Sequence, residues 1–280
     1  MKTIIQFIKD ITRPLRIFVL KILMTKNEKK AKSNYYLTNE LKNKYVDYSV
    51  KEEDVLKKKN HVIYTCITGC YDNLIQQNFY NPEYNYICYT DNEEWISQKV
   101  IGIWEIRPLA KTEFSNALNN RWHKTHPHEL FPDYEDSIYI DGNIDIMTSY
   151  LFDQIKNKKC NIAIPIHFER KCVYDEIKRL RWNKKISKQQ LKNIKKYLKE
   201  SGFPKNYGMN ENNIIFRKHH EKTIIKIMEE WWTIIKDVAP RDQLSLSYVL
   251  WKNHISVSDI AIDNARLRTE DYHFYYSEKH

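Results

Sequence analysis

The sequence predicts an α/β fold in which a mixed sheet is flanked by helices. From His61 onward, short runs of β-branched and aromatic residues alternate with longer segments of helical periodicity, as in strands joined by crossover helices. The chain has 280 residues, of which 42% are hydrophobic, so it can fill the core of one large domain or two small ones. Only five residues are glycines, and a glycine-rich phosphate loop is therefore not expected.

The elements can be placed along the chain from these patterns. Strands are predicted at residues 61–72 (HVIYTCITGCYD), 85–92 (NYICYTDN), 99–106 (KVIGIWEI), 136–146 (DSIYIDGNIDI), 160–168 (CNIAIPIHF) and 212–218 (NNIIFRK). Helices are predicted at residues 112–130, 149–158, 173–183, 187–200, 219–236 and 241–252.

Residues 1–32 form a basic arm with nine lysines or arginines against two acids, whereas the net charge of the whole chain is +10. On a helical wheel, the apolar side chains of residues 1–24 gather on one side and the basic ones on the other. Arg13, Arg16 and Lys21 interrupt the apolar stretch, so it cannot span a bilayer. We expect an interfacial helix on an anionic membrane surface, the alternative being a helix docked on the protein's own core.

The charge distribution also divides the chain. Residues 33–60 are polar and charged and are expected to form a charged helical connector. The α/β domain that carries the candidate site residues follows at 61–280. This larger part is close to neutral, which argues against a general nucleic-acid-binding protein. The five cysteines are scattered without a Cys-x-x-Cys pair, as expected for a reducing compartment such as the cytoplasm.

Ligands of open α/β sheets bind beyond the carboxyl ends of the strands, so the residues that follow each apolar run are candidates for a site. These positions carry hydroxyl, carboxylate, amide and imidazole groups, with two glycines among them. They are Thr68, Gly69, Tyr71 and Asp72 after the first strand, Asp91 after the second, Asp141, Gly142 and Asn143 in the fourth segment, and His167 and Arg170 after the fifth.

The turn at Asp141 is the strongest of these candidates. A buried strand delivers Asp141 to the sheet edge, Gly142 permits a close approach, and Asn143 adds a second oxygen ligand. Mg²⁺ and Mn²⁺ prefer carboxylate and carbonyl oxygens, which diphosphate oxygens can supplement. Asp-Gly also occurs as a simple turn after a strand. An aspartyl-phosphate mechanism is disfavoured because Tyr139 stands where the nucleophilic aspartate would be.

Several motifs in order resemble one known family. They are VIYTCITGCYDNL, YICYTDN, Arg121-x-x-Lys124 leading to HELFPDYEDSIYIDGNI, IPIHFERKCVYDE and RDQLSLSYVLW, together spanning residues 61–253. This chain resembles the glycosyltransferase-like domain of plant turgor-regulation-defect and mucilage-related proteins and of their bacterial relatives. The resemblance implies a bacterial GT-A enzyme, with a Rossmann-like nucleotide-sugar-binding domain and an Asp-x-Asp metal motif. Here the motif is Asp-Gly-Asn, so Asn143 replaces a carboxylate and the metal would bind more weakly.

The resemblance also implies roles for individual residues, each of which has a structural alternative as a helix cap, loop contact or solvated face. Contacts with the donor nucleoside are implied for Thr68, Gly69, Tyr71, Asp72 and Asp91, and contacts with the diphosphate for Arg121 and Lys124. The implied metal ligands are Asp141, Asn143 and His273. Sugar or acceptor contacts are implied for His167, Arg170, Tyr174, Glu176 and Arg241, and the catalytic base for Asp242 or, second, Glu211.

Together these features predict a glycosyltransferase on the inner face of the cell membrane. It would move a sugar from a nucleotide-sugar donor, with help from Mn²⁺ or Mg²⁺, to a lipid-linked or cell-surface polysaccharide such as capsule or lipopolysaccharide. Two alternatives remain at this stage: a nucleotide-sugar hydrolase on the same fold, and a non-catalytic module that binds membrane or nucleic acid.

Overall fold

The computed structural model describes residues 50–167, 169–180, 186–263 and 272–274. The chain divides into two units, Met1–Tyr48 and Ser49–His280, and all described residues belong to the second. The predicted interfacial helix of residues 1–24, and the connector up to residue 49, lie outside the described residues. No helix in the described part is both long enough and apolar enough to cross a bilayer.

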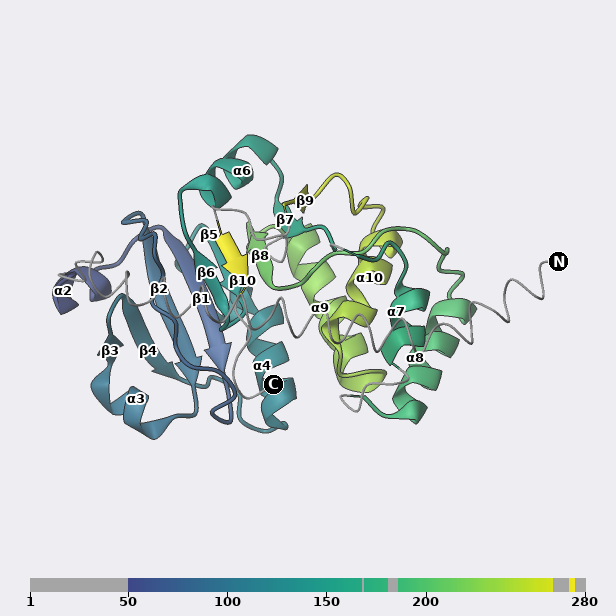
Figure 1. The fold of residues 1–280 in the computed structure, drawn as a ribbon, viewed down its shortest axis with the longest axis horizontal. Helices are drawn as coiled ribbons and strands as arrows, with labels where there is room; N and C mark the ends of the chain where they lie inside the picture. Colours follow the sequence, from purple (N-terminus) through teal and green to yellow (C-terminus); the bar gives the residue numbers. More distant parts are fainter. Residues whose placement is uncertain (1–49, 168, 181–185, 264–271, 275–280) are drawn as a thin grey trace, which may run out of the picture. The chain divides into compact units, whose positions relative to one another are not determined.

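The second unit is built on a mixed sheet, which Figure 1 shows. The strands are β1 (His61–Ile67), β2 (Tyr84–Thr90), β3 (Val100–Ile101), β4 (Trp104–Pro108), β5 (Asp136–Ile140), β7 (Ile162–Pro165), β8 (Ile214–Arg217) and β9 (Ala261–Ile262). In the described residues they form an eight-stranded sheet of order β3-β4-β2-β1-β5-β8-β7-β9. β1, β2, β4 and β5 are parallel, whereas β8 runs antiparallel to both β5 and β7.

A separate two-stranded ribbon pairs β6 (Ile144–Ile146) with β10 (Tyr272–Phe274). The helices are α2 (Glu52–Leu56), α3 (Glu93–Gln98), α4 (Asn116–Thr125), α5 (Pro127–Leu130), α6 (Tyr150–Lys158), α7 (Val173–Leu180), α8 (Lys188–Glu200), α9 (Lys222–Asp237), the 3-10 helix η1 (Asp242–Leu244) and α10 (Leu246–Lys252).

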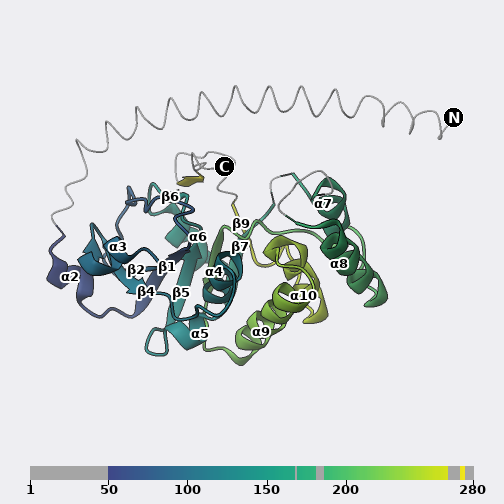
Figure 2. The ribbon, with the colours of Figure 1, turned by 90° about the horizontal axis from the view of Figure 1, so that it is seen from below.

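Helices cover both faces of the sheet, and Figure 2 shows α6 and β6 on one side with α4, α5 and α9 on the other. Successive side chains of each strand point to opposite faces of the sheet, and both faces therefore carry apolar side chains. Tyr64 points toward the α4 side, where its ring contacts those of Tyr139 and Phe131 at centroid distances of 5.3 and 4.8 Å. On the α6 side, Tyr84 and Phe152 have ring centroids 5.1 Å apart. Both faces of the sheet are therefore buried, as the predicted α/β fold requires.

The predicted fold class is confirmed, and three of the deviations occur where glycine or proline interrupts a pattern. The segment 99–106 forms two short antiparallel strands, because Gly102 adopts a φ of +60° between them. The helix expected at 112–130 is two helices, since Pro127 has no N–H to continue α4. The segment 136–146 also divides in two, at the turn formed by Asp141, Gly142 and Asn143.

Candidate active site

The turn after β5 lies at the carboxyl ends of the parallel strands. The N–H of Asp141 donates to the carbonyl of Asn213 at 2.9 Å, and the N–H of Ile144 donates back to the carbonyl of Asp141 at 3.0 Å. A Cβ atom on Gly142 would lie 3.1 Å from Ile67 and 3.3 Å from the Cβ of Asp72. Glycine therefore lets the loop after β1 approach this turn, which brings two of the predicted donor-binding segments together.

Lys124 of α4 lies between two carboxylates that are far apart in the sequence. Its Nζ is 3.1 Å from Asp141 Oδ1 and 2.9 Å from Asp242 Oδ2. The ammonium also stands over the ring of Tyr139, 4.7 Å from the centroid. The Lys124 side chain is only 1% exposed. A lone buried ammonium is strongly unfavourable, so the two carboxylates and the ring stabilise the lysine at this position.

Asp242 also pairs with Arg121, whose Nε lies 3.4 Å from Asp242 Oδ1. Burial by itself would raise the pKa of Asp242, but Arg121, Lys124 and Arg241 outweigh it and hold that pKa well below its usual range. Asp242 therefore stays ionised and is a weaker proton acceptor than an ordinary carboxylate.

We call Arg121, Lys124, Asp141 and Asp242 the charge cluster. Its two cations and two anions balance, and its members differ in exposure. Asp141 is 34% exposed and Arg121 is 26% exposed, whereas Asp242 is 8% exposed. A ligand can therefore reach Asp141 and Arg121 directly, while the buried Lys124 holds Asp141 and Asp242 through its ion pairs.

A buried arginine fixes the end of the helix that carries the cluster. Arg217 of β8 is fully buried, and it donates to the carbonyl of Lys124 at 2.5 Å and to the hydroxyl of Tyr64 at 2.6 Å. Burial lowers the pKa of Arg217, and the contact with Tyr64 partly offsets this effect. These bonds hold the last turn of α4 against the sheet, and so fix the height of Lys124 above it.

A second group of polar side chains forms a closed ring of contacts beside the charge cluster. We call this group the polar ring; it consists of His167, Arg170, Glu176, Glu211, Arg241 and Gln243. His167 Nε2 is 3.4 Å from Glu211 Oε2. The backbone N–H groups of Glu169 and Arg170 both lie 3.2 Å from His167 Nδ1, and the Nη1 atom of Arg170 lies 3.4 Å from His167 Nε2.

The other contacts close the polar ring. Gln243 Nε2 donates to Glu211 Oε1 at 3.0 Å, and Arg241 donates to Gln243 Oε1 at 3.4 Å. Glu176 lies between two arginines, 3.8 Å from Arg241 and 3.0 Å from Arg170. Five residues predicted from the sequence are thereby brought together with one that was not predicted, Gln243.

The 3-10 helix η1 connects the two groups. Asp242, its first residue, faces Lys124 and Arg121, whereas the residues on either side, Arg241 and Gln243, belong to the polar ring. The carbonyl of Asp242 accepts from the indole N–H of Trp231 at 3.1 Å, which ties η1 to α9. Of the predicted site residues on this segment, Asp242 therefore belongs to the charge cluster and Arg241 to the polar ring.

The predicted nucleoside-binding residues hold one another in the loop after β1. Gly69 adopts a φ of +63°, and its N–H donates to both carboxylate oxygens of Asp91 at 2.9 Å. The hydroxyl of Thr68 donates to the carbonyl of Asn116 at the start of α4, at 2.9 Å. Tyr71 is 48% exposed, so its ring stands open to a ligand. Tyr174, by contrast, is buried in the core and donates to the carbonyl of Phe203 at 2.8 Å.

Two buried asparagines were missed from the sequence. Asn212 and Asn213 are 3% and 2% exposed, and the amide atoms of both lack hydrogen-bond partners among the described residues. They precede β8, which is antiparallel to β5, so they lie at the same sheet edge as Asp141. Buried amide groups without partners are uncommon, and here they supply hydrogen-bonding capacity beside the charge cluster.

The turn after β5 offers oxygen atoms of the type that hard divalent cations bind. Asn143 is 8% exposed, and its Oδ1 has no hydrogen-bond partner among the described residues. Asp141 contributes a part-exposed carboxylate two residues earlier. The strand pairing sets the backbone of His273 opposite Asp145, two residues after Asn143. Carboxylate and amide oxygens are the ligand types that Mg²⁺ and Mn²⁺ prefer.

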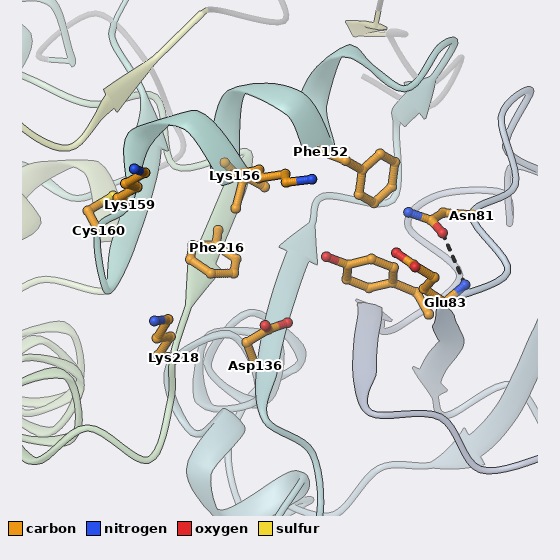
Figure 3. A pocket seen from close by; sticks show the side chains of 11 residues that line it. Asn81, Glu83, Asp136, Phe152, Lys156, Lys159, Cys160, Phe216 and Lys218 are labelled. Carbon is orange, nitrogen blue, oxygen red and sulfur yellow. Dashed lines mark hydrogen bonds between the residues drawn. The ribbon is translucent and has the colours of Figure 1, made fainter.

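A pocket of about 480 Å³ lies away from these groups, at the N-terminal ends of β2 and β5 (Figure 3). Asp136 and Tyr84, the first residues of β5 and β2, line it, with Lys156 and Phe152 of α6. Asp141 follows the opposite end of β5. Because none of the predicted site residues lines this pocket, it is not the candidate active site.

The fold and the site together define a class of protein: an α/β domain with a charged, partly open site at the carboxyl ends of its parallel strands. The sequence profile of the TOD1/MUCI70, glycosyltransferase-like domain matches residues 24–264. The chain belongs to this TOD1/MUCI70 family, and glycosyl transfer is the function that the membership supports. No curated protein sequence matches the chain.

Glycosyltransferases are among the solved structures that resemble this chain. The bifunctional glycosyltransferase WbbM, in its apo form, has 10% identity and a TM-score of 0.44 over 75% of this chain and 39% of that one. Mouse xyloside xylosyltransferase 1 has 8% identity and a TM-score of 0.40, covering 74% and 85%. GlyE of Streptococcus pneumoniae TIGR4 has 12% identity and a TM-score of 0.39, covering 71% and 45%. The chain therefore spans less than half the length of WbbM and of GlyE.

Proposed function

We propose that the protein is a GT-A glycosyltransferase that takes a sugar from a nucleotide-sugar donor. The observation that carries this proposal is the charge cluster, in which α4 presents Lys124 to Asp141 at the sheet edge and both Arg121 and Lys124 to Asp242. Departure of a nucleoside diphosphate develops negative charge, and preorganised cations stabilise that charge. Arg121 is the part-exposed cation, so we assign it to the diphosphate, with Lys124 as the residue that positions Asp141.

A divalent cation is the proposed cofactor, held by Asp141 Oδ and Asn143 Oδ1 together with the donor. When bound, it would neutralise diphosphate charge as a Lewis acid. Because Asn143 is neutral and Lys124 already neutralises part of the charge of Asp141, we expect weak binding in the absence of donor. His273 remains a proposed third ligand on the basis of its place opposite Asp145.

Glu211 is the proposed proton acceptor for the acceptor hydroxyl in an inverting reaction. Asp242 was the first choice from the sequence, but its lowered pKa and its two ion pairs favour a positioning role. Glu211 Oε2 instead lies 3.4 Å from Nε2 of His167, within the polar ring. The remaining residues of the polar ring, Arg170, Glu176 and Arg241, are proposed to orient the sugar or the acceptor.

The donor proposal is tested by a thermal-shift screen of the purified full-length chain. We expect one nucleoside diphosphate, and the nucleotide sugars that contain it, to raise the melting temperature, and Mn²⁺ to increase the shift. A ligand that binds only the native state stabilises it by about 2.7 kcal/mol at 100 times its Kd. Nucleosides without phosphate serve as the control. A cooperative melting transition that no nucleotide shifts would contradict the proposal.

The acceptor is proposed to be lipid-linked or a growing cell-surface polysaccharide such as capsule or lipopolysaccharide. The proposed location of the enzyme is the inner face of a bacterial cell membrane. The support is the basic amphipathic sequence of residues 1–24.

Removal of residues 1–24 is expected to shift the protein from anionic liposomes to the soluble fraction. Each basic residue near an anionic surface contributes about 1 kcal/mol, so the loss of several should reduce binding by orders of magnitude. Co-sedimentation with vesicles of anionic and of neutral lipid measures the effect. As a control, donor binding by the shortened chain should be unchanged. Equal sedimentation of the full-length and shortened chains would sink the proposal of an interfacial helix.

A further inference from the structure

The helices α4 and α5 lie beside α9 (Figure 2). A group of histidine and carboxylate side chains from these helices lies outside the charge cluster and the polar ring. His126 occupies the break between α4 and α5, Glu129 follows in α5, and Glu229 lies on α9. One ligand atom from each of these three residues lies within 4.8 Å of the other two. His128 joins the group, because its Nε2 is 3.0 Å from Glu229 Oε1.

The hydrogen bonds of His126 fix the ring in the tautomer that a metal ligand needs. Nδ1 lies 2.8 Å from the carbonyl of Trp122, which can only accept, so Nδ1 carries a proton. The hydroxyl of Thr125 lies 2.9 Å from the same nitrogen and donates its own proton to the carbonyl of Arg121, so it can accept as well. Histidines that bind metals commonly donate their other N–H to a backbone carbonyl in this way.

The lone pair of His126 therefore faces a carboxylate. In the neutral ring, Nε2 has no proton, yet it lies 3.5 Å from Glu229 Oε1. Two acceptors facing each other at this distance repel unless a cation lies between them. Ligand atoms about 2.0–2.1 Å from a tetrahedral zinc ion are about 3.4 Å apart, which matches the observed separation.

Among the described residues, no lysine or arginine forms an ion pair with Glu129 or Glu229. The Nδ1 atom of His128 is buried and has no hydrogen-bond partner there. A divalent cation would neutralise both carboxylates and satisfy the Nε2 of His126.

We propose that His126, Glu129 and Glu229, with His128 as a fourth donor, form a zinc site that ties α5 to α9. Two imidazoles and two carboxylates arranged tetrahedrally around one ion favour Zn²⁺, whereas the all-oxygen ligands at Asp141 favour Mg²⁺ or Mn²⁺. The site lies two residues after Lys124, so an ion bound there would also fix the end of the helix that carries the charge cluster.

The test uses the untagged full-length protein after removal of metal by chelation. Titration with Co²⁺, a spectroscopic substitute for Zn²⁺, is expected to give a saturable visible absorption of tetrahedral type at one equivalent, which Zn²⁺ displaces. Trp122 provides a second readout, because its ring stacks on that of His126 with centroids 4.5 Å apart. Bound Co²⁺ should therefore quench tryptophan fluorescence at the same stoichiometry.

Variants separate this site from the site at Asp141. His126→Gln and Glu229→Gln should each weaken Zn²⁺ binding by more than about 100-fold, since even outer-shell changes cost 10–100-fold. Glu229 is half-exposed, so its variant is expected to fold if the one at the buried His126 does not. Asp141→Ala and Glu200→Gln, an exposed acid on α8, should leave the Co²⁺ spectrum unchanged. No saturable spectrum, or one that survives in Glu229→Gln, would overturn the proposal.

Discussion

Replacement of Asp242 by asparagine is expected to lower the free energy of unfolding by about 3–5 kcal/mol. The substitution leaves Lys124 and Arg121 without the carboxylate between them, and removal of one partner from a buried ion pair is strongly destabilising. Urea denaturation measures the loss. Asp237→Asn, which affects an exposed acid at the end of α9, should stay within about 0.5 kcal/mol of the parent. A similarly small loss of stability in both variants would contradict the claim that the buried ion pairs of Asp242 stabilise the fold.

The same substitution should change the response to acid. Because the folded-state pKa of Asp242 lies below its unfolded value of about 3.9, its stabilising effect is complete above that value. The stabilisation is lost as the pH falls from about 5 through the folded-state pKa. The difference in stability between the parent and Asp242→Asn should therefore narrow in acid. Curves that remain parallel from pH 7 to pH 2 would show that Asp242 is not the group responsible.

Replacement of Asp141 by alanine is expected to abolish metal-dependent donor binding while the fold stays stable. Asp141 is part-exposed, and Lys124 retains its shorter contact with Asp242 in the variant. Donor at 100 times its Kd stabilises the parent by about 2.7 kcal/mol, and the part of this stabilisation that depends on Mn²⁺ should disappear in the variant. Asp136→Ala, at the opposite end of β5, is the matched control and should retain it. Donor affinity equal to that of the parent in Asp141→Ala would falsify the assignment.

Much of the fold follows from the sequence because the strands are continuous apolar runs. The runs at β1, β2 and β5 are buried on both faces, so their composition predicts them without knowledge of their neighbours. The direction of β8 does not follow from its composition. Site residues are expected after each strand only where the strands are parallel, and Asn212 and Asn213, which precede an antiparallel strand, were therefore not predicted.

The candidate site could be predicted in part. Asp141, Arg121 and Lys124 were predicted, because a strand end and an i, i+3 pair on a helix are local patterns. The contact between Lys124 and Asp242 joins residues 118 positions apart, and no local pattern carries such information. For the same reason, Asp242 was expected to be a base, and its two ion pairs became visible only in the folded chain.

The balanced charge of the cluster also constrains how its sequence can change. Loss of Lys124 alone would leave two anions facing one cation in a buried place, whereas loss of Lys124 together with Asp242 would restore neutrality. The two substitutions should thus be far from additive. Over evolutionary time, these positions are expected to be kept or exchanged as a pair, with the acid near the C-terminal end of the chain changing together with the lysine on α4.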